Sequence, residues 1–447
     1  MAYSRWASKE EIINKTTQIS YDSIIKKSGI EIMYDDNHLY IDDKEAHNLI
    51  IGATGSGKTV ATMLPQIRLA IKAGESFVVN DIKGEIYKKL SGEIKKEGYK
   101  LYVINLVNTN RGNNYNPLYL PYKLYKAGEK DNALEMIENV GYYLLSSEVS
   151  ANEDPFWVNS AINLFTGLAL YLFENAKESE INLNSLSLLA NESEKLKKYL
   201  KTLDKSSLIY IYLSGIFEAP NETKGSILAV FKQRTKLYTV KEGLSKVLCN
   251  NNIDLENIQK DKTALFIINE NKPSTKELVS LIIDQCNYME SINPNKERRL
   301  NFYIDDFENL KTIKDFVNVL NLSRGNNVRY NIYIKSLLEL DNVYGKEYTE
   351  LLKMSFGNII YLLANDIETL QQISRLCGRI DENTSLITEE ELKTMDYFEA
   401  IIITPRMYPI KTKLLPDFNI DWKFEEKPVE QPNLEFDKVE LYTMKED

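Results

Sequence analysis

The sequence is poor in the residues that usually build metal centres and disulfide frameworks. Its 447 residues hold only two histidines and three cysteines, Cys249, Cys286 and Cys377. The cysteines are scattered and odd in number, and no two of them have the close spacing of a zinc site. This pattern indicates buried or free thiols in a reducing compartment.

The chain also lacks a surplus of positive charge and an apolar start. Its 55 Lys and Arg against 65 Asp and Glu give a net charge of −10. Such a balance argues against a surface that coats duplex DNA without specificity, although a locally basic channel remains compatible with it. The first residues, MAYSRWASKEE, contain no apolar run, so we expect no signal peptide.

Long uncharged runs are rare, and for one of them we consider whether it could be a transmembrane helix. Residues 155–173, PFWVNSAINLFTGLALYLF, carry no charge and are nearly long enough to cross a bilayer. Asn159, Asn163 and Thr166 would each be costly in lipid, and Pro155 heads the run. We therefore interpret the run as a buried helix of a helical domain, and we expect no transmembrane helix in this chain.

What the sequence does contain is an alternation of short apolar, β-branched segments with helical patterns. It indicates an α/β fold with a largely parallel sheet. The expected strands are 48–51, 76–80, 101–106, 264–268, 302–305, 329–334, 359–363 and 400–404. Between residues 121 and 218 the pattern is helical instead, over 131–145, 157–174, 183–190, 193–203 and 206–217. We interpret this stretch as an all-α domain inserted into the α/β core.

This reading divides the chain into five segments. They are an N-terminal extension (1–45) with a short hairpin around 31–41, the first part of a nucleotide-binding domain (46–120), the all-α insertion (121–218), the second part of the nucleotide-binding domain (219–421), and an acidic tail (422–447). The tail has weak periodicity and two prolines, which is typical of disorder. An interaction peptide is the alternative interpretation.

The clearest motif is a glycine-rich loop between an apolar strand and an amphipathic helix. GATGSGKT fits the pattern G-x-x-x-x-G-K-[ST] of a phosphate-binding loop. Its glycines let backbone N–H groups turn toward phosphates, Lys58 would neutralise the β- and γ-phosphates, and Thr59 would place its hydroxyl on Mg²⁺. The expected nucleotide contacts are Gly52, Thr54, Gly55, Ser56, Gly57, Lys58 and Thr59.

Such a loop needs a carboxylate on a neighbouring strand to hold the magnesium shell. LNFYIDDFENL supplies an apolar strand that ends in two acids. Asp305 is the expected magnesium ligand together with Thr59, and Asp306 stands where a base that activates water would be. The alternative is a pair of solvated acids at a strand end.

Further motifs follow one another along the chain. They are SRWASKEEI at Ser4, VVNDIKGEIYKK around Asp81, NYNPLYLP near Asn116, EDPFWVNSA near Phe156, ETKGSILAVF at Glu222, LSRGNNV at Ser323 and SLLELDNVYG at Ser336. In this order, together with GATGSGKT, they resemble the type IV secretion and conjugation coupling proteins. These are TraG/TraD-like DNA-transfer ATPases of the FtsK and HerA branch of P-loop nucleotidases. The resemblance extends from about residue 4 to residue 418.

The resemblance implies a RecA-like nucleotide-binding domain, an inserted all-α domain for substrate recognition, and a homohexamer around a channel. It implies a P-loop ATPase that uses ATP and Mg²⁺. The implied partners are a relaxase–DNA complex or protein substrate, channel components at the inner membrane, and single-stranded DNA. The chain is expected in the cytoplasm, recruited to the cytoplasmic face of the bacterial membrane. Arg324 would act as an arginine finger across the subunit interface, although its residue context fits a surface arginine equally well.

Three features depart from the family pattern. Family members usually begin with transmembrane helices, and this chain begins where those would end, so an anchor is lost or belongs to a separate subunit. The usual Asp-Glu pair is Asp305-Asp306 here, and the shorter side chain would hold its carboxylate about 1 Å further from the attacking water, which can cost on the order of 100-fold in rate. The glutamine expected on the following strand, which would sense the γ-phosphate, is Lys335.

Three functions are consistent with these residues. The leading hypothesis is a coupling ATPase that recruits a DNA–protein or protein substrate and delivers it to a type IV secretion channel. The second is a docking or gating hexamer that binds nucleotide and hydrolyses it weakly, because of Asp306 and Lys335. The third is a cytosolic DNA translocase of the FtsK and HerA kind.

Overall fold

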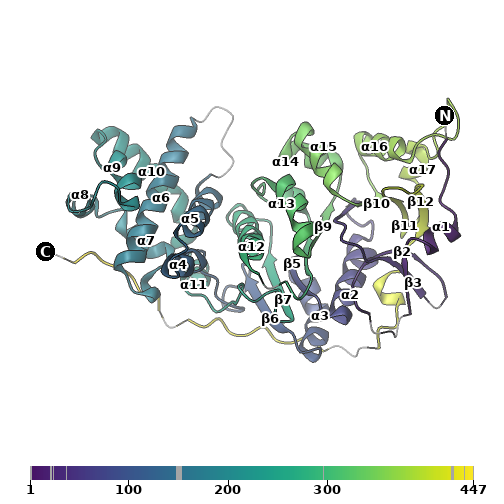
Figure 1. Ribbon diagram of the computed structural model, residues 1–447, viewed down its shortest axis with the longest axis horizontal. Helices are drawn as coiled ribbons and strands as arrows, with labels where there is room; N and C mark the ends of the chain where they lie inside the picture. The colour runs from purple at the N-terminus through teal and green to yellow at the C-terminus, as the bar shows by residue number, and fades with distance from the viewer. Residues whose placement is uncertain are drawn as a thin grey trace. The chain divides into compact units, whose positions relative to one another are not determined.

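The computed structural model describes residues 3–445, apart from 21, 22, 24, 37, 147–153, 295, 424–426 and 437. The chain forms two compact units, and most of their helices and strands are labelled in Figure 1. The first unit consists of Met1–Tyr102, Leu255–Ile267 and Met289–Glu430, and the second of Val103–Asp254, Ile268–Tyr288 and Gln431–Asp447.

A nine-stranded sheet in the order β12-β11-β10-β4-β9-β8-β5-β7-β6 lies mostly in the first unit. Its strands are β4 (Asn48–Gly52), β5 (Ser76–Ile82), β6 (Lys100–Asn105), β7 (Thr263–Asn269), β8 (Leu300–Ile304), β9 (Val328–Ile334), β10 (Asn358–Leu363), β11 (Glu399–Ile403) and β12 (Ile410–Lys413). The neighbours β10, β4, β9, β8 and β5 run parallel, and β11 and β12 add an antiparallel edge. The predicted α/β fold with a mostly parallel sheet is confirmed. The polar edge strand β12 was not predicted.

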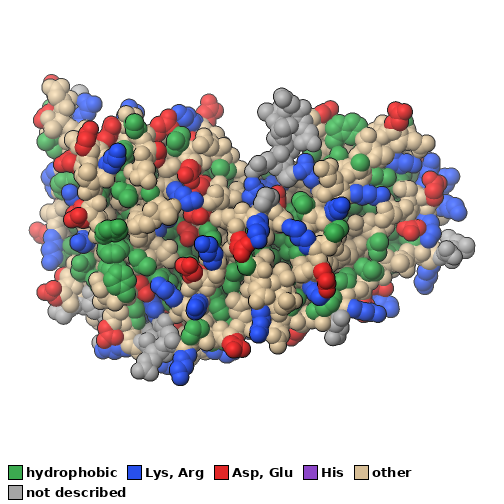
Figure 2. Space-filling model, turned by 180° about the vertical axis from the view of Figure 1, so that it is seen from behind, with side chains coloured by type: hydrophobic (Ala, Val, Ile, Leu, Met, Phe, Trp, Pro, Cys, Tyr) green, Lys and Arg blue, Asp and Glu red, His purple; other side chains and the backbone are tan. Residues whose placement is uncertain are grey.

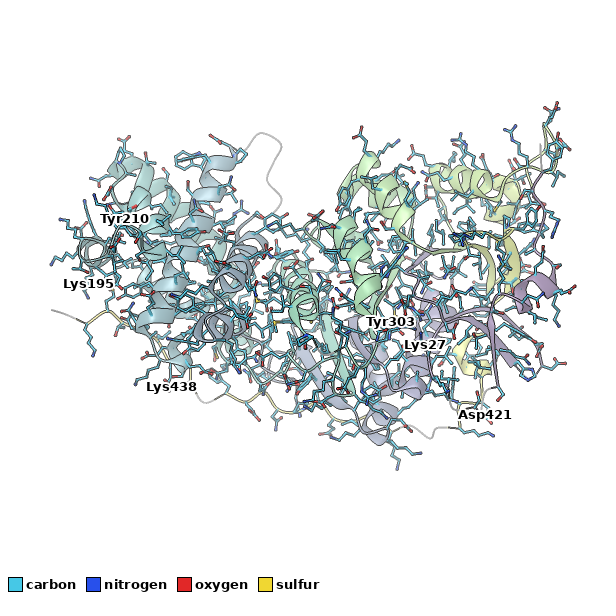
Figure 3. The ribbon with its side chains drawn as sticks, viewed as in Figure 1. Lys27, Lys195, Tyr210, Tyr303, Asp421 and Lys438 are labelled. Carbon is cyan, nitrogen blue, oxygen red and sulfur yellow. The ribbon has the colours of Figure 1, made fainter. Side chains whose placement is uncertain are left out.

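The central strands are buried along their whole length, as continuous apolar runs in parallel sheets require. Helices cover both faces. In Figure 1, α2 (Leu64–Ala73) and α3 (Glu85–Lys96) lie on one side, and α13 (Phe316–Ser323), α14 (Leu337–Tyr344) and α15 (Lys346–Ser355) lie on the other. Tyr303 of β8, labelled in Figure 3, is buried and donates a hydrogen bond of 3.3 Å to the Gln66 carbonyl of α2.

The N-terminal segment forms a small antiparallel sheet in the order β1-β3-β2. Its strands are β1 (Thr17–Ser20), β2 (Ile30–Tyr34) and β3 (His38–Asp42), preceded by α1 (Lys9–Ile13). The predicted hairpin is β2–β3, while β1 was missed. Ile19, Leu39 and Ile41 pack with Leu69 of α2 and with Trp422, so this sheet shares a core with the helix that follows the glycine-rich loop.

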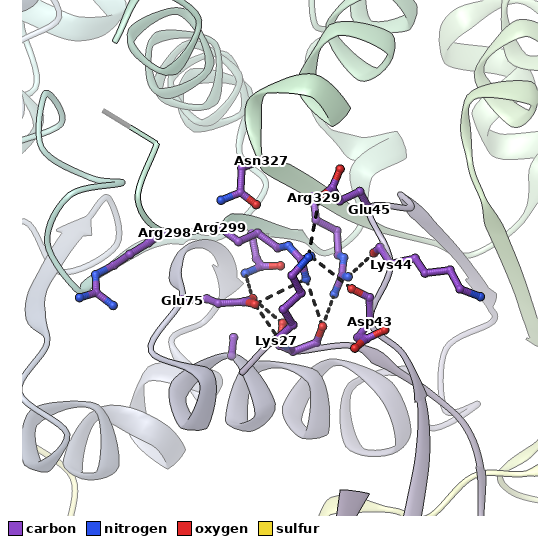
Figure 4. Close-up of polar contacts among 12 residues, drawn as sticks. Lys27, Asp43, Lys44, Glu45, Glu75, Arg298, Arg299, Asn327 and Arg329 are labelled. Carbon is purple, nitrogen blue, oxygen red and sulfur yellow. Dashed lines mark hydrogen bonds and ion pairs between the residues drawn. The ribbon is translucent and has the colours of Figure 1, made fainter. Parts of the chain in front are cut away.

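A buried polar network lies at the amino-terminal ends of β5, β8 and β9 (Figure 4). Glu75, Arg299 and Arg329 are each at most 5% exposed. Both arginines donate to the Ser28 carbonyl, at 3.1 and 3.0 Å, and Arg299 lies 3.5 Å from Glu75. Burial lowers the pKa of Arg329 to about 10, and the neighbouring Arg299 contributes to this shift. The network fastens the loops of the N-terminal sheet to the central sheet.

The second unit is a helical bundle. Its helices are α4 (Tyr119–Lys126), α5 (Lys130–Leu145), α6 (Pro155–Asn175), α7 (Leu183–Leu189), α8 (Ser193–Leu200), α9 (Leu208–Phe217), α10 (Asn221–Thr239) and α11 (Glu242–Cys249), with most of α12 (Pro273–Ile292). Helix α6 contacts α5, α7, α9 and α10. The helical unit therefore extends beyond the expected boundaries of 121 and 218, because α10 and α11 pack onto the same helices.

Helix α6 is the uncharged run of the sequence, and it lies at the centre of this bundle. It is long and apolar enough to cross a membrane, and 67% of its most apolar window is buried within the protein. A Cβ atom on Gly167 would lie 2.4 Å from Leu213 Cδ2 of α9, so the two helices pack closely at this glycine. This placement favours the interpretation as a buried core helix.

The acidic tail differs from the expected disorder. Its described residues lie extended and hydrogen bonded: the N–H of Val429 donates to Ser91 of α3 in the first unit (2.9 Å). In the second unit the N–H of Leu434 donates to the Asn110 carbonyl (3.0 Å), and the N–H of Tyr442 donates to Ser185 (2.9 Å). These contacts use mostly backbone groups, which leave no mark on the apolar periodicity of a sequence.

Charged side chains of both signs are interspersed over the face drawn in Figure 2.

The first unit is completed by α16 (Ile367–Cys377) and α17 (Glu389–Lys393). All three cysteines are buried and unpaired, as the sequence predicts.

Candidate nucleotide-binding site

The predicted site residues other than Arg324 meet at one edge of the central sheet, because parallel strands deliver their carboxyl ends to the same side. The register pairs Ile51 of β4 with Ile334 of β9, and Ile304 of β8 with Ile332 of β9. The glycine-rich loop after β4, Lys335 after β9 and the two acids after β8 therefore begin side by side.

The glycine-rich loop requires its glycines. A Cβ on Gly52 would lie 2.4 Å from Ser56 Oγ and 2.7 Å from Lys58 Cγ. Gly55 and Gly57 adopt φ values of +84° and +90°, a region that side chains rarely tolerate. Thr54 and Gly55 are exposed at the tip, and Lys58 is buried with its Nζ donating to the Gly52 carbonyl. The loop thus curls around the position of its own lysine.

The helix that follows the loop starts at Thr59 with one π-helical turn, η1 (Thr59–Met63), and continues as α2. Its amino-terminal end therefore adjoins the loop, where the helix dipole favours an anion. Arg68 of α2 is buried between Glu93 of α3 and Asp417, and lies 2.9 Å from Asp417. This ion pair fixes the helix to the C-terminal part of the unit.

The two acids after β8 have different surroundings. Burial, with a smaller contribution from the neighbouring Asp306, raises the pKa of Asp305 to about 6, while Lys58 and Lys335 oppose the shift. The Asp305 carbonyl accepts a hydrogen bond of 2.8 Å from Asn80 of β5. Asp306 has a φ of +46°, so its backbone is held in the left-handed region that non-glycine residues seldom adopt. Such strain is typical of functional sites.

Lys335 bridges two carboxylates. Its Nζ lies 3.4 Å from Asp306 and 3.5 Å from Glu308. Although burial opposes the shift, these two acids raise the pKa of Lys335, which favours its protonated form. Glu308 is buried, and burial raises its pKa. Glu308 was not singled out from the sequence, and its only signal is its position three residues after Asp305.

Residues 81–85, DIKGE, shape the turn between β5 and α3. The Asp81 carboxylate accepts hydrogen bonds from the N–H groups of Ile86 (3.1 Å) and Tyr87 (2.7 Å). Burial raises the pKa of Asp81 to about 6 against the effect of these bonds. Lys83 is exposed with a φ of +67°, and Gly84 follows with +74°. Asp81 therefore organises the start of α3, and the turn presents Lys83 to solvent.

Arg324 is not brought to this site. It lies in a short turn, η4 (Arg324–Asn326), before β9, whereas Lys335 follows that strand. Arg324 is thus at the opposite edge of the sheet, where it donates to the Ser355 carbonyl. Within one chain it is far from the phosphate loop along the strand direction. Two further arginines, Arg375 near the end of α16 and Arg379 just after it, are exposed to solvent.

The residues present fit a magnesium nucleotide. Ser56 Oγ is buried in the loop and has no hydrogen-bond partner among the described residues. A phosphate oxygen would satisfy it. Thr59 and Asp305 supply the hydroxyl and carboxylate oxygens that Mg²⁺ prefers, and Lys58 supplies the charge that phosphates require.

Comparison with known proteins identifies a family. A family model for type IV secretory system conjugative DNA transfer matches residues 4–381. The coupling protein TraD of Escherichia coli (strain K12) is 25% identical over 206 residues, which are 44% of this chain and 28% of TraD, so the chain spans well under half of that relative.

Solved structures share the fold. The plasmid coupling protein TrwB, in complex with a non-hydrolysable ATP analogue, is 16% identical with a TM-score of 0.69 over 93% of this chain and 94% of its own. VirB4 of Thermoanaerobacter pseudethanolicus is 11% identical with a TM-score of 0.57 over 88% and 97%. The expected RecA-like unit with an inserted helical unit is thereby confirmed. Because the family model spans most of the chain, this protein belongs to the type IV secretory system conjugative DNA transfer family, the coupling proteins.

Proposed function

We propose that this chain is a coupling ATPase that recruits a DNA–protein or protein substrate and delivers it to a type IV secretion channel. The observation that carries the proposal is the convergence of Lys58 and Asp305 at one sheet edge, close enough for the charge of Lys58 to lower the pKa of Asp305. Structures of TrwB contain an ATP analogue or ADP with Mg²⁺, which supports the same ligands here.

Each residue of the edge has a part in this function. The loop from Gly52 to Thr59 would bind the phosphates, with Lys58 on the β- and γ-phosphates. Thr59 and Asp305 would hold Mg²⁺, which when bound neutralises charge on the phosphate oxygens. Asp306 would orient and deprotonate the attacking water, and Lys335 would approach the γ-phosphate.

Arg324 supports assembly into a ring. Because it lies at the edge opposite its own phosphate loop, it can act on a nucleotide only in a neighbouring copy. This position supports the homohexamer and the finger role that the family resemblance implies. The helical unit would receive the substrate, and the chain would meet the channel at the cytoplasmic face of the membrane, with a membrane-anchor subunit as a further partner.

ATPase activity of purified protein, fractionated by size and measured with and without single-stranded DNA, tests the proposal. We expect Mg²⁺-dependent turnover in the hexamer fraction and stimulation by DNA. A protein that binds no ATP analogue, or binds it unchanged after Lys58→Ala, would contradict it.

A second function is favoured by one specific contact. The 3.4 Å pair between Lys335 and Asp306 ties up the carboxylate that would act on water. In a docking or gating hexamer that binds ATP and hydrolyses it weakly, this ion pair would stay formed. In that case the same assay gives full nucleotide binding with turnover that DNA does not stimulate.

A further inference from the structure

Two phenylalanines lie beside the phosphate loop, at the sheet edge that carries the nucleotide site. Strand β11 runs antiparallel to β10, and β10 runs parallel to β4 with Leu363 opposite Gly52. The start of β11 therefore adjoins the phosphate loop. Phe398 immediately precedes this start, and Phe418 lies in η5 (Asp417–Asn419), which contacts the first turn of the helix after the loop.

Phe398 rests directly against the loop. A Cβ built on Gly57 would be 2.9 Å from Phe398 Cε1, so the ring occupies the space that any larger residue at position 57 would need. Phe398 has a φ of +67°, a conformation that an aromatic residue adopts only when its surroundings enforce it. Its carbonyl accepts a hydrogen bond of 2.8 Å from the Leu414 N–H, which fixes the backbone in place.

Phe418 is held beside it and left open to solvent. Its side chain is 68% exposed, and its ring centroid lies 6.1 Å from that of Phe398 at an interplanar angle of 67°. The preceding residue, Asp417, is buried and lies 2.9 Å from Arg68 of α2. The position of Phe418 is therefore fixed relative to the helix that begins at the phosphate loop.

We propose that Phe398 and Phe418 form an aromatic platform, in which the base of the bound nucleotide stacks on one ring and contacts the edge of the other, while neither ring hydrogen-bonds to the base. The proposal rests on the proposed nucleotide binding and adds its base subsite. The occupant follows from position: a nucleotide whose phosphates lie in the loop from Gly52 to Thr59 must direct its ribose and base out of that loop, and Phe398 covers the loop at Gly57.

The chemistry of the platform sets its specificity. Phenylalanine rings offer a flat apolar face and no hydrogen-bonding groups, and every base has a face that stacks on them. Base–aromatic stacking of this kind contributes enough that its loss weakens binding by roughly 5- to 100-fold. Because nothing on the rings distinguishes adenine from guanine, both purine nucleotides should gain equally.

The test compares ligands with and without a base. Affinities of a non-hydrolysable ATP analogue, the matching GTP analogue and inorganic tripolyphosphate, each with Mg²⁺, are measured by calorimetry on the full chain. Phe418→Ala removes the exposed ring. Phe398→Asn removes the other and retains a residue that tolerates positive φ. Phe156→Ala, which removes another half-exposed phenylalanine (50%) on α6, is the matched control.

We expect Phe418→Ala and Phe398→Asn to weaken both nucleotide analogues by the same factor, about 5- to 100-fold, and to leave tripolyphosphate binding unchanged. Phe418→Trp should restore nucleotide affinity. The control should change nothing. Thermal unfolding of each variant verifies that it is folded. If the Phe398→Asn variant does not fold, the Phe418→Ala variant alone tests the proposal.

Three results would overturn the platform. Equal weakening of tripolyphosphate would mean that the rings only shape the loop. Unchanged nucleotide affinity, with or without a change in oligomeric state, would assign the rings to another contact. A loss confined to one purine would show edge recognition elsewhere. If the unmodified chain bound none of the three ligands, the proposed nucleotide function itself would fail, which is a different outcome.

Discussion

The parallel strands of the central sheet have an amino-terminal edge and a carboxyl-terminal edge, and the polar residues at these two edges differ in how they are hydrogen bonded. At the amino-terminal edge, Arg299 and Arg329 are buried and hydrogen bonded to backbone carbonyls beside Glu75 (Figure 4). At the carboxyl-terminal edge, Asp306 has a left-handed backbone and Ser56 Oγ has no partner among the described residues. In the first arrangement both guanidinium groups donate to backbone carbonyls and only Arg329 Nε lacks a partner among the described residues, whereas the second combines a left-handed backbone with unmet hydrogen bonds at Ser56 Oγ and at both carboxylate oxygens of Glu308.

This difference separates residues that maintain the fold from residues that await a ligand. Strain and unsatisfied buried groups persist where function requires them, and the rest of the structure holds them in place. We therefore expect substitutions at the amino-terminal edge to lower stability, and substitutions at the carboxyl-terminal edge to change nucleotide binding and turnover. Arg324, a predicted functional residue at the amino-terminal edge, is the exception that can break the rule.

The largest effect is expected for Arg324→Ala. A finger acting on the neighbouring nucleotide contributes about 10³–10⁵ in rate, so turnover by the assembled protein should fall by that order while ATP-analogue affinity is retained. Single-turnover assays and equilibrium binding measure the two quantities. Because Arg324 also donates to the Ser355 carbonyl, thermal unfolding must be compared as well. Loss of stability with unchanged turnover would place Arg324 with the structural residues.

Next comes Arg299→Ala, which removes a buried cation from the amino-terminal network. Taking one partner from a buried ion pair usually costs about 3–5 kcal/mol of unfolding free energy, because the other charge is left behind. Chemical denaturation measures this loss. Lys27→Ala, which removes an exposed lysine 3.8 Å from the exposed Glu45, is the control and should change little. Nucleotide affinity of the folded fraction should not change, and a change would contradict the separation of the two edges.

Asp306→Glu combined with Lys335→Gln should raise turnover by roughly 100-fold if those two residues restrain hydrolysis. The longer carboxylate reaches the attacking water, and removal of the lysine frees it from the 3.4 Å ion pair. The steady-state ATPase rate is the measurement, with each single substitution alongside. An unchanged rate in the double variant would show that the lysine–carboxylate pair is not the restraint.

The smallest of these effects is on binding. Lys58→Ala removes a charged donor to the phosphates and should weaken an ATP analogue by about 10- to 100-fold, since hydrogen bonds to charged groups contribute roughly 1.5–3 kcal/mol. Lys83→Ala, an exposed lysine on the neighbouring turn, is the matched control and should bind normally. Equal losses in both variants would indicate general electrostatics rather than a defined phosphate contact.

Much of the carboxyl-terminal edge could be predicted because it depends on local patterns. The loop GATGSGKT and the strand that ends in Asp305 each carry their signal within a few residues, and parallel topology brings them together. The family pattern singled out Lys335, and the structure adds its ion pair with Asp306. Neither local pattern nor periodicity could reveal Phe398, because its contact with Gly57 joins residues that are far apart in the sequence.

The same limit explains the missed elements. The polar β12 and the short β1 have too few apolar residues for a period-two signal, and sheet neighbours stabilise them instead. Glu308 reads as an ordinary helix-start acid, and only its burial beside Lys335 distinguishes it. The buried arginines of the amino-terminal edge look like surface residues in the sequence, because composition cannot show that carbonyl groups surround them.

The extended C-terminal segment has a consequence for any molecule that would recognise it. Its backbone groups at Leu434 and Tyr442 are already bonded to the helical unit. A protein that captured this segment as an added strand would have to exchange those bonds for its own, at about 0.5–1.5 kcal/mol for each bond given up. A partner would therefore compete with the helical unit for the tail. The susceptibility of the tail to limited proteolysis should report whether it is bonded to the helical unit or released from it.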